Sequence, residues 1–89
     1  MPTVSFTTHL QRHIGCPATS VAGGTVREVL DAVFVSNPRA RGYVLDDQGA
    51  VRKHVAVFVN GALIADRTSL TDPVRSDDRI FVMQALSGG

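Results

Sequence analysis

The sequence has a single cysteine, almost no net charge and no long hydrophobic run, and each of these absences excludes a class of protein. One cysteine, Cys16, cannot form an intramolecular disulfide or supply the four thiolates of an iron–sulfur cluster. No apolar stretch approaches the roughly 20 residues of a membrane span, and the first residues lack the pattern of a signal peptide. The reducing cytoplasm is therefore the expected location, and no membrane partner is expected.

The charges are few and nearly balanced. Nine Lys and Arg residues against eight Asp and Glu residues leave a formal charge of +1, and they are dispersed along the chain. Binding to nucleic acid requires a basic patch or stripe, which this distribution does not provide. With 89 residues, the chain is long enough for one small domain, which we expect over residues 1–84, followed by a flexible tail at 85–89.

Alternating apolar and polar residues predict several strands. Val4 and Phe6 alternate with polar residues in a first strand over residues 3–10, and a second short strand near 18–22 completes a hairpin through a loop at 15–17. The clearest signal is HVAVFVNGALI at 54–64, where Asn60-Gly61 is a favoured two-residue turn between two strands. Residues 79–86 form the expected last strand.

One amphipathic helix is predicted after Gly24. Thr25 and Glu28 match a capping box, and apolar residues follow at helical spacing. Asn37-Pro38 should end or interrupt this helix, with a further helical turn at 39–45. One such helix can cover one face of a small sheet, so the expected fold is α+β, a mixed sheet of four to five strands covered on one face by one main helix. The expected stripe consists of Val26, Val29, Leu30, Val33 and Phe34.

This order of elements, with a last strand that continues into Gly88-Gly89, resembles the ubiquitin-like β-grasp sulfur carriers of the MoaD/ThiS type. The matching stretches are residues 55–61, the Asp-containing turn before Ile80-Phe81-Val82, and residues 85–89. The length and the stretch RKHVAVFVNG are most similar to the longer MoaD-like and CysO-like members.

The resemblance implies a carrier without catalytic residues or a stably bound cofactor of its own. An ATP-dependent enzyme of the MoeB/ThiF type would adenylate the carboxylate of Gly89, and sulfur would then give a terminal thiocarboxylate. The other implied partners are a sulfur donor and a sulfur-accepting synthase or sulfhydrylase, and a metalloprotease is a further candidate. Glycine at 88 and 89 suits entry into a narrow cleft because it lets the backbone approach closely. Ser87 and Leu86 would form the flexible lead.

A docking patch is expected on the outer face of the sheet. Strand alternation places the three valines of residues 55–59 in the core and Phe58 outward. The resemblance places Phe81 and Met83 on the same outer face. Contiguous exposed apolar side chains often mark an interaction site. The expected patch consists of Phe58, Phe81 and Met83, continued by Leu86.

Two other functions use the same features. A ubiquitin-like modifier would join Gly89 to lysines of other proteins through an isopeptide bond. A non-covalent binding subunit would dock through its β-grasp fold, and its glycines would be idle.

Three further clusters are expected to be incidental. His9, His13 and Cys16 fall on an expected strand end and loop, without the register of a zinc site, so no metal is expected. Gly23-Gly24-Thr25 lacks the lysine and spacing of a phosphate-binding loop. Residues 52–54, Arg-Lys-His, are interpreted as a solvated strand entrance, with contact to an acidic partner as the alternative.

Overall fold

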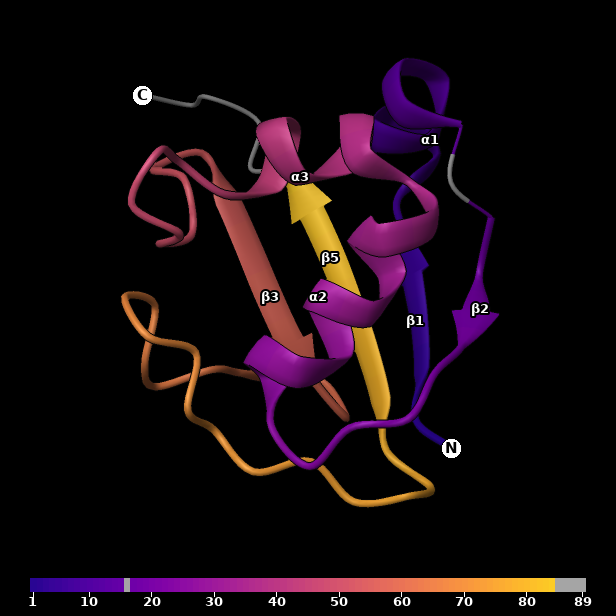
Figure 1. Ribbon diagram of the computed structural model, residues 1–89, viewed down its shortest axis with the longest axis vertical. Helices are drawn as coiled ribbons and strands as arrows, with labels where there is room; N and C mark the ends of the chain where they lie inside the picture. The colour runs from indigo at the N-terminus through magenta and orange to yellow at the C-terminus, as the bar shows by residue number, and fades with distance from the viewer. Residues whose placement is uncertain (16, 85–89) are drawn as a thin grey trace.

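The computed structural model describes residues 1–15 and 17–84 and contains a five-stranded sheet with three helices in that part of the chain (Figure 1). The elements in chain order are β1 (Thr3–Phe6), α1 (Thr8–Ile14), β2 (Thr19–Ser20), α2 (Val26–Ser36), α3 (Pro38–Val44), β3 (Val55–Val59), β4 (Ala62–Leu63) and β5 (Arg79–Gln84). The sheet order is β2-β1-β5-β3-β4. The expected α+β class and mixed sheet are confirmed.

Strand β5 is the centre of the sheet. It pairs in parallel with β1 and antiparallel with β3. The two outermost strands, β2 and β4, have two residues each. The last strand of the chain is therefore held by a neighbour on each side.

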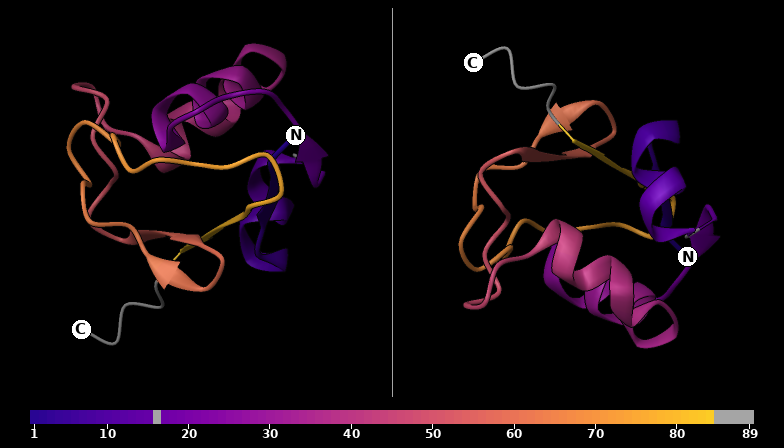
Figure 2. Two further views of the ribbon diagram at one scale, coloured as in Figure 1. Left: turned by 90° about the horizontal axis from the view of Figure 1, so that it is seen from below. Right: turned by 90° about the horizontal axis from the view of Figure 1, so that it is seen from above.

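Helices α2 and α3 lie together on one face of the sheet, as the two end-on views show (Figure 2). The predicted stripe of α2 is confirmed, since all five of its members are buried. Along the central strands, burial alternates: Val57 and Val82 are fully buried, whereas the neighbouring Phe58 and Phe81 are not. The core therefore lies between the helices and one face of the sheet, which leaves the other face available.

Helix α1 was not expected. Residues 8–14 were predicted to complete the first strand and enter a loop, but they form a helix that contacts α3 and β5. Its ends are well defined: the Thr7 Oγ1 accepts a hydrogen bond from the Leu10 amide at 3.4 Å, and Gly15 adopts a left-handed conformation at φ 59°. The predicted hairpin pairing of β1 with β2 is present nonetheless, with Thr3 opposite Ser20.

The start of α2 follows the predicted capping pattern with one change. The Glu28 amide donates to the Thr25 Oγ1 at 3.2 Å, as expected. The Glu28 carboxylate accepts from the amide of Gly24 at 2.8 Å rather than from that of Thr25. Helix α3 begins directly at Pro38, which is compatible with a first helical position because proline has no amide to satisfy there.

A tight turn connects β3 to β4, and a long loop connects β4 to β5. Asn60 and Gly61, at φ 51° and 85°, form the predicted turn between β3 and β4. The long connection from β4 to β5 is held by carboxylates that accept backbone amides, a role the sequence did not reveal. The Asp66 carboxylate accepts the Thr71 hydroxyl at 2.6 Å and the amides of Ser69, Thr71 and Thr68, and these bonds hold the pKa of Asp66 far below its usual range.

Candidate functional site

The predicted chemical terminus follows the central strand. Gln84 is the last residue of β5 and pairs with Val55 of β3. The pairing with β1 ends two residues earlier, where Val82 pairs with Phe6. The end of β5 lies below α3 in Figure 1. The predicted tail residues Leu86, Ser87, Gly88 and Gly89 lie outside the described residues, and so does the rest of the predicted tail segment at 85–89.

The three described members of the predicted docking patch lie on one face of the sheet. Phe58 and Phe81 are direct cross-strand partners, and Met83 faces Ala56 on the same side. Phe81 exposes 39% of its surface, while Phe58 and Met83 are half-buried. This is the face opposite α2 and α3, so the strand alternation was interpreted correctly.

Sequence reasoning missed one member of this surface. Leu63 of β4 pairs with Phe58 and exposes 56% of its surface. The two-residue turn at 60–61 contains the signal, because such a turn places residue 58 opposite residue 63. Phe81, Phe58 and Leu63 thus form one row across three strands, and we call these residues together with Met83 the outer-face patch.

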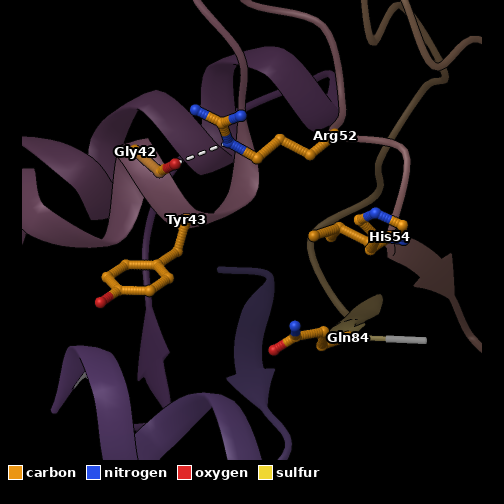
Figure 3. A pocket seen from close by; sticks show the side chains of 6 residues that line it. Gly42, Tyr43, Arg52, His54 and Gln84 are labelled. Carbon is orange, nitrogen blue, oxygen red and sulfur yellow. Dashed lines mark hydrogen bonds between the residues drawn. The ribbon is translucent and has the colours of Figure 1, made fainter. Parts of the chain in front are cut away.

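A hollow of about 290 Å³ lies beside the end of β5 (Figure 3). Side chains from three elements surround it: Tyr43 comes from α3, His54 from the turn before β3, and Gln84 from β5. The Arg52 guanidinium lies at its rim, where the Nε donates to the Gly42 carbonyl at 2.7 Å. The remaining lining residue is Val55.

The turn that carries the basic residues is fixed at several points. The Arg52 amide donates to the Val44 carbonyl at 2.9 Å, and the Arg52 carbonyl accepts from the Val55 amide at 3.0 Å. The same carbonyl accepts from the Arg67 Nη2 at 2.7 Å. The side chains of Arg52, Lys53 and His54 are all exposed at this end of the sheet.

The histidine and cysteine candidates for a metal site lie in and just after helix α1. His9 and His13 lie in helix α1, which corrects the expectation of a strand end and loop, and Cys16 lies outside the described residues. The side chains of His9 and His13 are outside the described part of the structure, and among the side chains that it does describe no group of three or more His, Cys, Asp or Glu could hold a metal ion.

Gly23 and Gly24 have a structural explanation. A Cβ on Gly23 would lie 2.7 Å from the Val29 Cγ2 and 2.9 Å from the Val29 amide nitrogen, so the helix start leaves no space for a side chain. The amide of Gly24 is already bonded to Glu28.

Among the helices the structure describes, none is long and apolar enough to cross a bilayer.

Comparison with known proteins gives a consistent family. Residues 12–89 match the ThiS family. The solved structure of the Amycolatopsis orientalis BexX/CysO complex contains a chain that is 24% identical, with a TM-score of 0.84 and all of both chains covered. CysO of Mycobacterium tuberculosis is 21% identical, with a TM-score of 0.81 and coverage of 97% of this chain and 100% of that one. SAMP1 of Haloferax volcanii is 25% identical, with a TM-score of 0.78 and coverage of 99% and 98%. No curated protein matches the sequence.

Proposed function

The chain belongs to the ThiS family of ubiquitin-like sulfur carriers, and we propose from this that its C-terminal Gly89 carries sulfur as a thiocarboxylate. The observation that carries the proposal is that the family match includes Gly88 and Gly89. The described residues form a five-stranded sheet, and its central strand is the element that precedes these glycines in the chain.

The proposed reaction has three steps. A carboxylate is a poor electrophile, so an oxygen of the Gly89 carboxylate first attacks the α-phosphorus of ATP and displaces pyrophosphate. Hydrosulfide, or an equivalent sulfur donor, then attacks the carbonyl carbon of the acyl-adenylate, AMP leaves, and a proton is released. In the last step the thiocarboxylate donates its sulfur to an acceptor, and water restores the carboxylate.

The carrier contributes shape rather than catalysis. Side chains at 88 or 89 would obstruct a narrow cleft, whereas glycine leaves the carbonyl carbon accessible. The catalytic groups and the ATP site belong to an adenylating enzyme of the MoeB/ThiF type, which we place in the cytoplasm with the carrier. A sulfur donor and an accepting synthase or sulfhydrylase complete the proposed set of partners.

We further propose that the outer-face patch docks these partners. Its row of Phe81, Phe58 and Leu63 lies on the face that the helices leave open. Burying such side chains at an interface is favourable by about 25 cal/mol per Å² of apolar surface. The solved complex of A. orientalis CysO with BexX supports docking to a partner protein as a property of this fold.

Intact mass spectrometry of the protein from its native cell tests the proposal. Exchange of one oxygen for sulfur at Gly89 is the expected result, and it should disappear when the adenylating enzyme is deleted. A terminus that stays a carboxylate after incubation with ATP, hydrosulfide and that enzyme would refute the assignment.

A second candidate is a protein modifier, favoured by the similarity to SAMP1, the small archaeal modifier protein 1 of H. volcanii. The same activated Gly89 would form an isopeptide bond with a lysine. Tryptic digestion of cellular proteins would then reveal lysines that carry a remnant of this C-terminus. Since Lys53 is the only lysine of the chain, every isopeptide bond between Gly89 of one copy and a lysine of another copy would have to form at Lys53.

A further inference from the structure

We propose that the hollow beside the end of β5 receives an aspartate or glutamate side chain of the adenylating enzyme, which binds the Arg52 guanidinium at the rim of the hollow, while the neighbouring exposed Lys53 adds to the positive charge that attracts it. This inference rests on the proposed function and adds the chemistry by which the partner is recognised. It concerns a site separate from the outer-face patch, at the end of the sheet rather than on its face.

The geometry of Arg52 is the first argument. A guanidinium has five N–H donors, and the Nε of Arg52 uses one of them on the Gly42 carbonyl. The two Nη groups have no acceptor among the described residues. The guanidinium is therefore oriented by a bond on one edge, and its other donors remain available for a carboxylate, which it can bind through two parallel hydrogen bonds.

Uncompensated charge is the second argument. Arg52, Lys53 and Arg67 meet at one turn, where the Arg67 guanidinium donates to the Arg52 carbonyl. Within residues 1–15 and 17–84, no acidic side chain forms an ion pair with any of them. On a chain with a net charge of only +1, this is a local concentration of positive charge. An acidic group of a partner would complement it.

The position of the hollow indicates that its partner is the enzyme that adenylates Gly89. Gln84 lines the hollow and is the last described residue before the segment that ends at Gly89. Five residues extend at most about 18 Å, so whatever binds and adenylates Gly89 must come close to this end of the sheet. The hollow measures about 290 Å³, which is enough for a carboxylate side chain with ordered water.

The turn itself is suited to this role because it is held in place before the partner arrives. Its backbone is bonded to Val44, Val55 and Arg67. A preorganised cation loses less freedom on binding than one on a mobile loop.

The test measures adenylation of the full-length chain by ATP–pyrophosphate exchange with the adenylating enzyme of the same organism. Removing Lys53 or Arg52 should raise the KM for the carrier about fivefold each at low salt, with kcat unchanged, because charges at an interface rim act mainly on association. At high salt, the increase in KM caused by each substitution should fall to about twofold, because salt screens the interaction between the charges. Lys53→Gln is the cleaner variant because no bond of the Lys53 side chain is present among the described residues, whereas Arg52→Ala also removes the bond to Gly42.

Arg79→Gln is the matched control. It removes the same charge from an exposed side chain at the opposite end of β5. Equal effects of Lys53→Gln and Arg79→Gln, or no effect of Lys53→Gln, would overturn the proposal while leaving the adenylation of Gly89 intact. Absence of any adenylation of the wild-type chain would refute the proposed function instead, and the inference would fall with it.

A carbodiimide, which joins an amine to a carboxylate without a spacer, gives a second readout. Because Lys53 is the only lysine, one cross-link from its side chain to an Asp or Glu of the enzyme is expected. A cross-link from Lys53 to the chain's own Gly89 or to a second copy of the chain would overturn the proposal, because it would show a different occupant.

Discussion

Two neighbouring residues of β5 provide a sharp test of which face of the sheet docks partners. Phe81 exposes 39% of its surface on the outer face, and Val82 is fully buried on the inner one. A phenylalanine presents about 200 Å² on average, so roughly 80 Å² of Phe81 remains to be covered in a complex. At about 25 cal/mol per Å², that burial contributes about 2 kcal/mol, or a factor of about 30 in Kd.

Phe81→Asp should therefore leave a folded protein whose Kd for the adenylating enzyme is raised about 30-fold or more. Val82→Asp should not fold, because an unpaired carboxylate in the core costs several kcal/mol and a domain of this size has only about 4–13 kcal/mol of stability. Circular dichroism melts measure folding, and isothermal titration calorimetry measures binding.

The control is Val35→Asp on α2, at a side chain that exposes 82% of its surface on the helical side of the molecule. It should leave the Kd unchanged and lower the stability by no more than about 1 kcal/mol, because the new carboxylate lies in the last turn of α2, four residues after Asp31. If Phe81→Asp melts as low as Val82→Asp, the faces of β5 are misassigned. If it folds and binds with the affinity of the wild type, the outer-face patch is not the docking surface.

Three other predictions concern the terminus and the stability of the domain. Deletion of Gly89 should abolish acyl-adenylate formation and leave the melting temperature unchanged; retained ATP–pyrophosphate exchange would contradict the assigned terminus. Thr25→Ala removes the cap of α2 and should cost about 1 kcal/mol in urea unfolding, whereas Thr25→Ser should cost much less. Asp66→Asn should lower the melting temperature at pH 7, since the folded pKa of Asp66 lies below its unfolded value of about 3.9. That stabilisation is present above the unfolded value and is lost as the pH falls through the folded one, so the gap between wild type and variant should narrow below about pH 4, and a gap that is constant with pH would argue against the assigned hydrogen bonds.

Periodic patterns predicted the parts of the fold that depend on one buried face. The stripe of α2, the alternation of β3 and the Asn60-Gly61 turn were all correctly predicted, because each follows from local spacing. Helix α1 was missed because Val4 and Phe6 establish a period of two, and the cap residues Thr7 and Gly15 are weak signals beside it. Leu10 is buried in the core, and this tertiary contact is not visible in a seven-residue stretch.

The candidate site also has a part that the sequence predicted and a part that it did not. Strand alternation placed Phe58 correctly, and Leu63 could have been found from the turn register. The hollow could not be predicted, because Tyr43, Arg52 and Gln84 come from three elements that meet only in the folded chain. The Asp66 hydrogen bonds could not be predicted for a related reason. The sequence alone does not distinguish an aspartate that accepts hydrogen bonds from the amides of its own loop from one that only faces solvent.

The two-residue strands at both edges of the sheet affect how readily copies of this protein could associate with one another. Each of the three longer strands has a neighbour on both sides, although β2 and β4 cover only part of β1 and β3, so the sheet presents only short stretches of edge backbone onto which another copy could add. Such short borders limit edge-to-edge pairing between copies of the chain, which leaves the outer face of the sheet as the larger surface for contacts with other proteins.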